Sequence, residues 1–308
     1  MSTVTVAGAG EREAPSTRRP YLDEALLRKL DRLRLMSHRM HASGSHGGRR
    51  SRKRGTSVEF ADYREYTPGD DLRQIDWNIY GRSERLYVKL REDEESLAIY
   101  LLLDCSRSMD WGQANKLAFA RRVVAALGYV GLNSLDRVGV YAFSDRLHSP
   151  FPLTSGRAQA RRLFDYVAEI GPARETNIRQ ALYSFAALHR RSGLAIVLSD
   201  LMSAGSQEGL TAILDRGFEA VVLHVLDPQE MDPEVEGEVE LVDRETGRST
   251  TVTVDPVTLE NYKLHLAAWL QETEAFCRRR QVKYVPVSSA TPLDDMLFRQ
   301  LRLHRVLV

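Results

Sequence analysis

The stretch LAIYLLLDCSRSMD, residues 97–110, leads an apolar run directly into an aspartate and two serines at alternate positions. The run has no polar alternation, which is typical of a strand buried on both faces of a parallel sheet. Asp104, Ser106 and Ser108 then lie in the loop that precedes the next predicted helix. Sites in open α/β sheets form beyond the carboxyl ends of the strands. The stretch therefore predicts a site at that edge, with one carboxylate and two hydroxyls.

The rest of the chain alternates between strand-like and helix-like patterns, which predicts an α/β fold with three layers and a mainly parallel sheet flanked by helices. "LAIVLSD" (194–200) is a second fully apolar strand, and 147–153 reads as an edge strand because it contains two prolines. Two alternating runs predict an inserted hairpin near 238–254. Further strands are expected at 86–90, 137–143, 219–226 and 282–287, and helices at 116–132, 158–170, 178–189, 210–216, 259–280 and 293–301.

The N-terminal part has a different pattern. Residues 1–20 are interpreted as a disordered tail. A helix from Tyr21 places Leu22, Leu26, Leu30 and Leu33 on one face. This helix is expected to dock on the main domain, and a partner or membrane surface is the alternative. A basic, glycine-rich linker follows at 43–55, with a run from Arg49 to Arg54. The expected organisation is 1–55 for tail, helix and linker, and 56–308 for the domain.

Composition narrows the class of protein. The chain has 308 residues, of which 43% are hydrophobic, and a net charge of +1, so no overall field favours specific nucleic acid or a membrane surface. Cys105 and Cys277 are too few for a disulfide framework. The sequence shows no secretory signal pattern and no apolar run of about 18 residues that could span a bilayer. A cytoplasmic location is expected.

Two further segments bring oxygen ligands to the predicted site. Asp200 ends the second apolar strand, and Thr176 opens a predicted helix. A set of Asp, Ser, Ser, Thr and Asp suits a hard cation, because Mg²⁺ prefers about six oxygen ligands and accepts waters among them. Mg²⁺ is the expected cofactor, with Mn²⁺ or Ca²⁺ as alternatives. The competing interpretation is that Asp104 and the serines only cap the following helix.

The set Asp104-x-Ser106-x-Ser108, then Thr176, then Asp200 resembles the metal-ion-dependent adhesion site (MIDAS) of von Willebrand factor A domains. The resemblance covers roughly residues 97–290 and implies a von Willebrand factor A-like fold with a bound metal. Such domains often have glycines before the threonine, whereas this chain has Ala173, Arg174 and Glu175. Thr176 is therefore the least secure of the predicted ligands.

A second motif lies upstream, in the segment YREYTPGDDLRQIDWNIYGRSERLYVKLREDEE (63–95). Its dense charges allow either a structural network, in which Arg73 bridges carboxylates, or a partner-binding surface. Joined to the Asp-x-Ser-x-Ser motif, it resembles the bacterial domain-of-unknown-function 58 family. That resemblance implies work beside a MoxR-type AAA+ ATPase. Many members carry two upstream transmembrane helices, and this chain resembles the short kind without them. The motif residues singled out are Asp70, Asp71, Arg73, Asp76 and Trp77.

Enzymatic classes find little support in the sequence. The chain contains neither a G-x-x-x-x-G-K-[ST] loop for nucleotide phosphates nor a G-x-S-x-G elbow. Cys105 and His224 are interpreted as structural, because each lies within or at the end of a predicted buried strand. Neutral hydroxyl ligands leave a cation able to attract an acidic side chain from a protein partner. The sequence therefore favours a non-enzymatic, metal-dependent adaptor; the alternative is a metal-dependent hydrolase or phosphatase using Asp104 and Asp200.

Overall fold

The computed structural model describes residues 21–37, 63–67, 75–83, 85–89, 96–173, 176–189, 192–235, 237–242 and 249–308. The chain forms two compact units, of which the main unit comprises 1–41 with 97–308 and the second unit comprises 42–96. This division falls at other positions than the boundary at residue 55 that the sequence pattern suggested. The tail at 1–20 and the basic linker at 43–55 lie outside the described residues.

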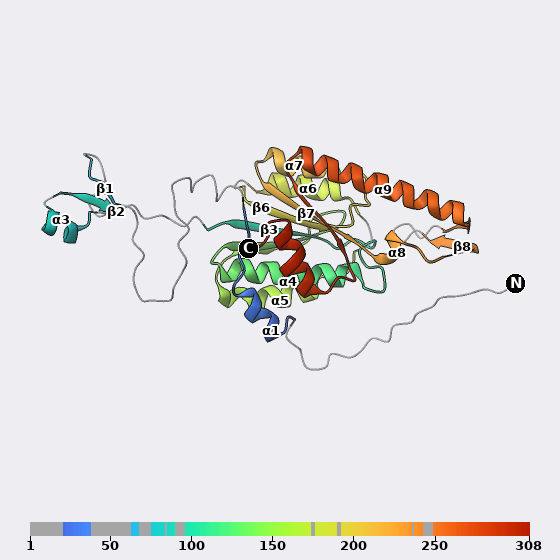
Figure 1. Ribbon diagram of the computed structural model, residues 1–308, viewed down its shortest axis with the longest axis horizontal. Coiled ribbons are helices and arrows are strands. Elements are labelled where there is room, and N and C mark those ends of the chain that lie inside the picture. The colour runs from blue at the N-terminus through green and yellow to red at the C-terminus, as the bar shows by residue number, and fades with distance from the viewer. Residues whose placement is uncertain are drawn as a thin grey trace. The chain divides into compact units, whose positions relative to one another are not determined.

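A six-stranded sheet with the order β10-β7-β6-β3-β4-β5 forms the centre of the main unit (Figure 1). Five strands run parallel. β5 lies at one edge, as its prolines predicted, and is antiparallel to β4. The strand bounds are β3 Ala98–Asp104, β4 Arg137–Phe143, β5 Phe151–Thr154, β6 Leu194–Ser199, β7 Glu219–Leu226 and β10 Lys283–Ser288. The chain thus has the predicted α/β class, with a mostly parallel sheet flanked by helices.

Helices cover both faces of this sheet (Figure 1). One face carries α1 (Glu24–Leu30), α4 (Lys116–Asn133) and α5 (Ala160–Glu169), and the other carries α6 (Ile178–Leu188), α7 (Ser206–Asp215) and α9 (Pro256–Arg279). The strands bury both of their faces because successive side chains point to opposite sides. Leu101 and Leu103 pack toward α4, while Tyr100 and Leu102 pack toward α6.

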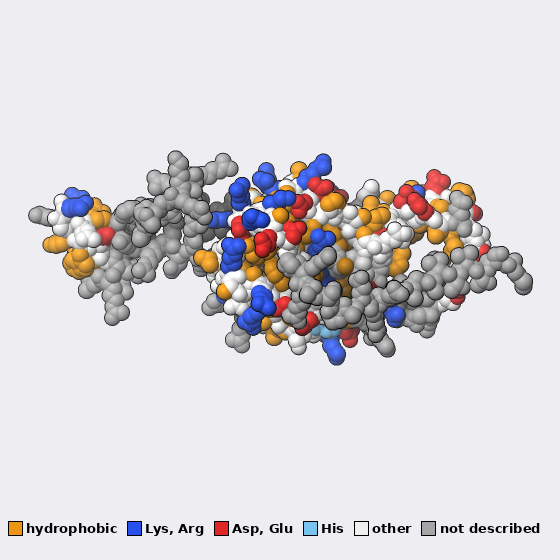
Figure 2. Space-filling view, turned by 90° about the horizontal axis from the view of Figure 1, so that it is seen from below, with side chains coloured by type: hydrophobic (Ala, Val, Ile, Leu, Met, Phe, Trp, Pro, Cys, Tyr) orange, Lys and Arg blue, Asp and Glu red, His pale blue; other side chains and the backbone are white. Residues whose placement is uncertain are grey.

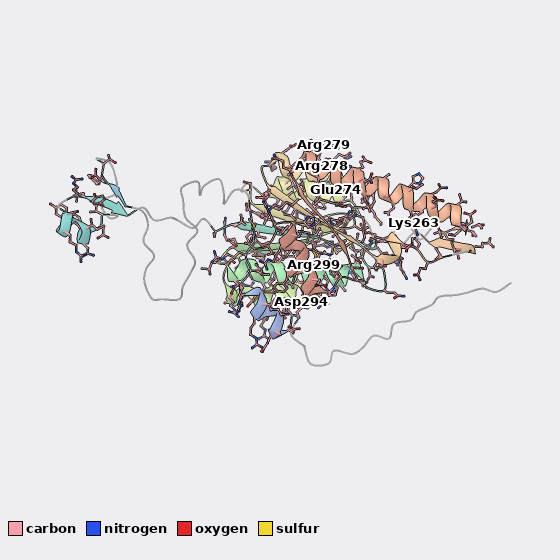
Figure 3. The ribbon with its side chains drawn as sticks, in the orientation of Figure 1. Lys263, Glu274, Arg278, Arg279, Asp294 and Arg299 are labelled. Carbon is pink, nitrogen blue, oxygen red and sulfur yellow. The ribbon has the colours of Figure 1, made fainter. Side chains whose placement is uncertain are left out.

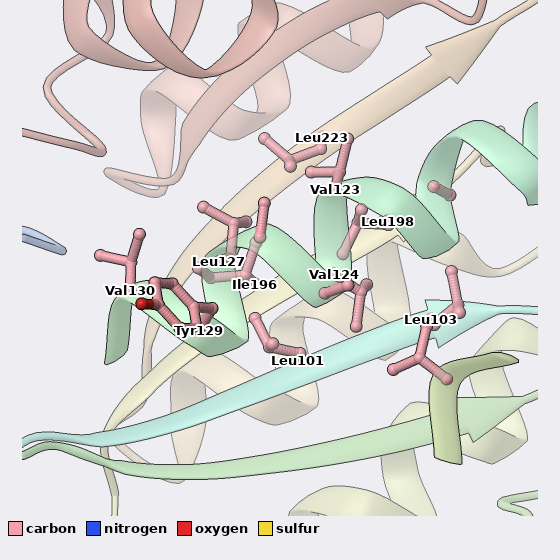
Figure 4. Close-up of a cluster of buried hydrophobic side chains, with 14 of the residues drawn as sticks. Leu101, Leu103, Val123, Val124, Leu127, Tyr129, Val130, Ile196, Leu198 and Leu223 are labelled. Atoms are coloured by element: carbon pink, nitrogen blue, oxygen red, sulfur yellow. The ribbon is translucent and has the colours of Figure 1, made fainter. Parts of the chain in front are cut away.

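The larger core lies between α4 and the strands (Figure 4). Leu101 and Ile196 from neighbouring strands meet Val124 and Leu127 of α4, and all four side chains have 0% exposure. α4 is buried along most of its length rather than on one stripe. Core contacts of this kind are worth roughly 1.5–3 kcal/mol per large apolar side chain relative to leaving it in water.

The N-terminal helix α1 belongs to the main unit and docks as expected from its leucine spacing. Leu26 and Leu30 are buried in the larger core. Asp23 caps the helix by accepting a hydrogen bond from the Leu26 amide at 2.6 Å. At its other end, Lys29 pairs with Asp294, whose place in the main unit is labelled in Figure 3. The partner-surface alternative for this leucine face is therefore wrong.

The described residues of the second unit form a small sheet and one short helix. β1 (Tyr63–Glu65) and β2 (Tyr87–Lys89) form an antiparallel pair, and α3 spans Trp77–Ser83. The strand expected at 86–90 therefore pairs locally and is not a strand of the central sheet. α3 was not predicted.

Other elements differ from the sequence-based expectation mainly at their ends. α7 begins at Ser206, four residues before the expected helix, because Gly205 adopts a left-handed conformation and ends the preceding turn. The closing helix divides into α10 (Leu293–Asp295), a π-helical turn (Met296–Gln300) and α11 (Leu301–Leu303). The predicted hairpin is present as β8 (Gly237–Val242) and β9 (Ser249–Val254), and a short helix α8 (Pro228–Met231) precedes it. No helix within the described ranges is long and apolar enough to cross a membrane.

Candidate functional site

The sheet order reverses between β3 and β6. From β3 the chain moves to β4 and β5 on one side, and then returns through α5 and α6 to β6 on the other side. Leu103 is in register with Leu198, so Asp104 and Asp200 both leave the sheet at this reversal. Such a switch point is where ligands bind in open α/β sheets.

Asp104 is held rigidly at the end of β3. Its side chain is buried, with one oxygen accepting from the Ser106 amide at 2.9 Å and the other from the Ser199 hydroxyl at 2.6 Å. Burial, together with the nearby charge of Asp200, raises the pKa of Asp104 from 3.8 to about 7, and the hydrogen bonds offset part of this rise. The carboxylate is therefore under-compensated, which is a setting that favours a nearby cation.

The two serine hydroxyls lie together, because Ser106 Oγ and Ser108 Oγ are 3.0 Å apart. They do not cap the next helix. α4 is capped by Asn115, whose side-chain oxygen accepts from the Ala118 amide at 2.8 Å. The interpretation of Asp104 and the serines as caps of that helix is therefore wrong.

Thr176 lies at the same edge of the sheet. The segment before α6 is fixed by two backbone hydrogen bonds, from the Ala173 amide to the Cys105 carbonyl at 2.7 Å and from the Asn177 amide to the Ser144 carbonyl at 3.0 Å. Cys105 and Ser144 directly follow β3 and β4. These bonds place the half-buried Thr176 near the loop that contains the two serines. Arg174 and Glu175 lie outside the described residues.

Asp200 does not stand alone at the edge of the sheet. One of its oxygens accepts from Lys116 Nζ at 2.8 Å, and the same ammonium contacts Glu230 at 2.5 Å. Lys116 has 0% exposure. Burial opposes its charge, but the two carboxylates outweigh this and leave the pKa of Lys116 above its usual value. A lysine from α4 therefore joins the end of β6 to α8.

His224 anchors the backbone of Asp200. Its Nε2 lies 2.8 Å from the Asp200 carbonyl oxygen, and its Nδ1 lies 2.6 Å from the Tyr284 hydroxyl. Since a carbonyl only accepts, Nε2 carries the proton and Nδ1 accepts from the tyrosine. Burial lowers the pKa of His224 to about 4, which keeps the ring neutral in this arrangement.

Asp227 directly follows β7 and lies at the same edge of the sheet. It is buried and accepts hydrogen bonds from the Ser289 hydroxyl at 3.0 Å and from the Gln229 amide. The loop after the serines approaches it closely, since a Cβ added at Gly112 would lie 2.0 Å from its carboxylate. Gly112 also has a backbone φ of +90°, which residues other than glycine rarely adopt.

The setting of Cys105 does not favour a nucleophile. It is buried, its Sγ lies 3.1 Å from the Phe143 carbonyl oxygen, and burial raises its pKa to about 12. A thiol at that pKa stays protonated at neutral pH. The interpretation of Cys105 as a core residue agrees with this geometry.

The predicted ligand set can be judged from the donors that it contains. Within the described part of the chain, no group of three or more His, Cys, Asp or Glu side chains is placed to hold a metal ion. The set depends instead on two carboxylates and on hydroxyls, which suit Mg²⁺ with waters completing its shell. Asp104 keeps lone pairs beyond its two hydrogen bonds, and the raised pKa reflects negative charge that a cation would balance. The residues present therefore fit such an ion.

Only part of the upstream motif is described. Asp76 caps α3, accepting from the Asn78 amide at 2.9 Å, while Trp77 is 63% exposed and contacts Tyr80 edge-on. Asp76 therefore has a structural role. Asp70, Asp71 and Arg73 lie outside the described residues.

A hollow of about 790 Å³ lies at the opposite, amino-terminal edge of the sheet. Residues at the starts of β7 and β10 line it, together with the end of α9. It is separate from the edge that carries Asp104 and Asp200.

Residues 62–269 match the model of the family described as "Protein of unknown function DUF58". The chain belongs to this DUF58 family. Its relatives include the uncharacterized proteins Rv1480 of Mycobacterium tuberculosis and Mb1516 of Mycobacterium bovis. Each is 27% identical over 221 residues, covering 70% of this chain and 69% of the relative.

Two solved structures are more distant from this DUF58 chain. The conserved hypothetical protein BatB from Bacteroides thetaiotaomicron has a TM-score of 0.43 and 16% identity, covering 68% of this chain and 98% of that one. An aerotolerance-related membrane protein from Bacteroides fragilis has a TM-score of 0.45 and 16% identity, covering 68% and 100%. At this level of similarity, neither structure carries its function over to this chain.

The sequence analysis did not single out five residues at this edge as part of the site: Lys116, Ser199, His224, Asp227 and Glu230. For Lys116, the sequence contains one indication of a special role. A lysine at the first position of a helix opposes the helix dipole, so it needs compensating carboxylates. His224 was read as structural, but it holds the carbonyl of a predicted ligand.

Proposed function

We propose that this DUF58 protein is a non-enzymatic, cation-dependent adaptor with a von Willebrand factor A-like domain, which binds a MoxR-type AAA+ ATPase. The observation that carries the proposal is the pairing of two buried carboxylates, Asp104 and Asp200, with two serine hydroxyls 3.0 Å apart at the switch point of the sheet. A cation there would be held by Asp104, Ser106, Ser108, Thr176 and Asp200, with Mg²⁺ as the first candidate. Mn²⁺ and Ca²⁺ remain alternatives.

The chemistry of the ligand set supports binding rather than turnover. Hydroxyl ligands do not neutralise the ion, so an acidic side chain of the partner can complete its shell. Besides Asp104 and Asp200, which the cation would occupy, two further described carboxylates lie at this edge: Glu230 is held by Lys116 and Asp227 by Ser289, and neither has the freedom expected of a general base. No ATPase or phosphatase activity is expected in a cytoplasmic adaptor of this kind.

The experiment is a binding measurement between the purified chain and its cognate ATPase, in Mg²⁺ and in EDTA. Ser106→Ala with Ser108→Ala should weaken binding about as strongly as EDTA does. Ser134→Ala with Ser155→Ala is the matched control, because both serines lie toward the other edge of the sheet. A charge-assisted contact contributes roughly 1.5–3 kcal/mol, so the surrounding surface must supply the rest.

Equal binding under all these conditions would remove the cation from the mechanism. Phosphatase or ATPase turnover that follows the protein through purification and disappears in Asp200→Ala would favour the hydrolase alternative. Circular dichroism must remain unchanged in each variant, so that loss of binding is not loss of folding.

A further inference from the structure

Directly after Asp227 in the sequence, the chain forms a group of elements that extends past the carboxyl edge of the sheet. It consists of α8, the β8–β9 hairpin and the first half of α9, residues 256–268, and is called the arm below (Figure 1). The arm is taken as the described residues 228–235, 237–242 and 249–268, and it belongs to the main unit.

The arm buries little of its own surface. In the first half of α9, most side chains are exposed on all sides of the helix. The buried residues of α9 are Thr273, Phe276 and Cys277, all in its second half. The hairpin forms its own two-stranded sheet, in which Thr251 and Thr253 are exposed. A two-stranded hairpin is marginally stable alone, and helices gain most of their stability from packing. A partner packed on the arm would therefore add stability that the arm has little of by itself.

Apolar side chains are exposed on the arm at several places. Val257 is 63% exposed and Leu264 is 62% exposed, and they lie seven residues apart on one side of α9. Met231 and Val235 are 47% and 43% exposed on the segment that leads into the hairpin. Several exposed apolar side chains on one group of elements are what a binding surface requires.

The charge of the arm is strongly one-sided. From Glu230 to Val242 the sequence holds six carboxylates and no Lys or Arg, and the first basic residue after them is Arg244. Glu238 and Glu240 occupy the same face of β8 and are exposed. Figure 2 shows acidic side chains beside hydrophobic ones at the end of the molecule where the arm lies.

The base of the arm is fixed to the candidate site. Glu230 of α8 contacts Lys116, which contacts Asp200. The Tyr262 hydroxyl of α9 donates to the Glu230 carbonyl at 2.6 Å, and Lys263 pairs with Asp232 at 2.5 Å. Figure 3 labels Lys263 at this end of α9. A protein seated on the arm would therefore lie beside the edge that carries Asp104 and Asp200.

We propose that the arm is the docking surface for a protein partner whose contact face has basic side chains around an apolar centre. Complementary charge steers such a partner and sets its orientation, while the apolar contacts supply most of the affinity. The inference rests on the proposed function, because it assigns the partner of the cation site to this neighbouring surface.

The test measures the Kd between the full chain and its cognate MoxR-type ATPase at two salt concentrations. Val257→Ser with Leu264→Ser, and separately Glu238→Lys with Glu240→Lys, should each raise the Kd roughly tenfold or more, the loss typical of anchor residues. Controls are Leu188→Ser with Leu303→Ser, which are 63% and 79% exposed elsewhere, and Asp215→Lys with Glu274→Lys, which are exposed toward the amino-terminal edge of the sheet. The control variants should leave the Kd unchanged. Binding by the unaltered chain should weaken with salt, and binding by the charge-reversed arm should depend on salt less steeply.

The outcomes separate the two proposals. If the unaltered chain binds but the arm variants match the controls, the arm inference is overturned and the adaptor function stands. If the unaltered chain does not bind the ATPase at all, both fall. Binding that is weakened by the serine substitutions but strengthened by Glu238→Lys with Glu240→Lys would overturn the basic character of the partner. A dimer of the chain alone, lost in the arm variants by light scattering, would make a second copy the occupant instead.

Discussion

Lys116 Nζ lies 2.8 Å from Asp200 Oδ2, and the two side chains are 0% and 2% exposed. The lysine begins α4 and the aspartate directly follows β6, and they are 84 positions apart in the sequence. This buried pair places a fixed positive charge beside one carboxylate of the candidate site, whereas the oxygens of the other, Asp104, accept hydrogen bonds from the Ser106 amide and the Ser199 hydroxyl. The different settings of the two aspartates follow from it.

Removing the lysine should destabilise the protein strongly. Lys116→Met keeps most of the side-chain volume but leaves Asp200 and Glu230 facing each other without the ammonium. Breaking a buried pair in this way costs about 3–5 kcal/mol of the free energy of unfolding. Urea denaturation of the variant and of the unaltered chain measures the difference.

The matched control is Lys263→Met, because its partner Asp232 is 71% exposed and the lysine is 50% exposed. An exposed pair is worth about 0–1 kcal/mol, so this variant should denature almost like the unaltered chain. Similar losses in the two variants would show that the Lys116 network has no special weight.

Stability should depend on pH through Asp104. Its pKa is raised from 3.8 to about 7 on folding by burial and by Asp200, so the folded state binds a proton that the unfolded state releases. This proton uptake adds to the free energy of unfolding. The added stability is fully present below about pH 4 and is lost as the pH rises through about 7. Asp104→Asn removes it, so the variant should gain stability relative to the unaltered chain across this interval.

The measurement compares the two proteins in EDTA and in Mg²⁺ at several pH values. Mg²⁺ should stabilise the unaltered chain at pH 8, because a cation offsets the charge that burial disfavours. The difference in the free energy of unfolding between the unaltered chain and Asp104→Asn should then become smaller. A difference in the free energy of unfolding that stays constant from pH 4 to pH 8 would contradict the assigned pKa of Asp104.

The sequence was sufficient for the sheet and for the position of the aspartates. Apolar runs such as 97–103 and 194–200 form strands wherever they are buried on both faces, and parallel neighbours end at one edge. Asp104 and Asp200 therefore had to arrive together. The strand at 86–90 was predicted without a partner, because a short alternating run fits any half-buried pair, and only its pairing with β1 decides which sheet it joins.

The polar contacts around the site could not be predicted in the same way. Lys116 lies 114 positions from Glu230, and Ser199 lies 95 positions from Asp104. Local patterns carry no information about such pairs. A lysine at a helix start and a histidine within a strand both have ordinary structural explanations, so their partners become apparent only once the strand ends are arranged in space.

The loop after the serines should tolerate no side chain at Gly112. Gly112→Ala requires a Cβ 2.0 Å from the Asp227 carboxylate and a φ near +90°. The strain alone costs on the order of 1–3 kcal/mol. Gly156 has a φ of +92° with no atom within 4 Å of its added Cβ, so Gly156→Ala reports the strain without the clash. In thermal denaturation, Gly112→Ala should lower the Tm more than Gly156→Ala, and equal shifts would mean that Asp227 can move aside.

The tyrosine behind His224 should act on the site without touching it. Tyr284→Phe removes the hydroxyl that donates to Nδ1, so the histidine is no longer held in the form that donates to the Asp200 carbonyl. One lost hydrogen bond costs about 0.5–1.5 kcal/mol of the free energy of unfolding. Calorimetry should also show weaker Mg²⁺ binding, because Asp200 is less firmly placed. Tyr183→Phe, at a tyrosine 48% exposed on α6, is the control and should change neither quantity. If Tyr284→Phe lowers stability but leaves the Mg²⁺ affinity at the control value, His224 supports the fold and has no part in positioning Asp200.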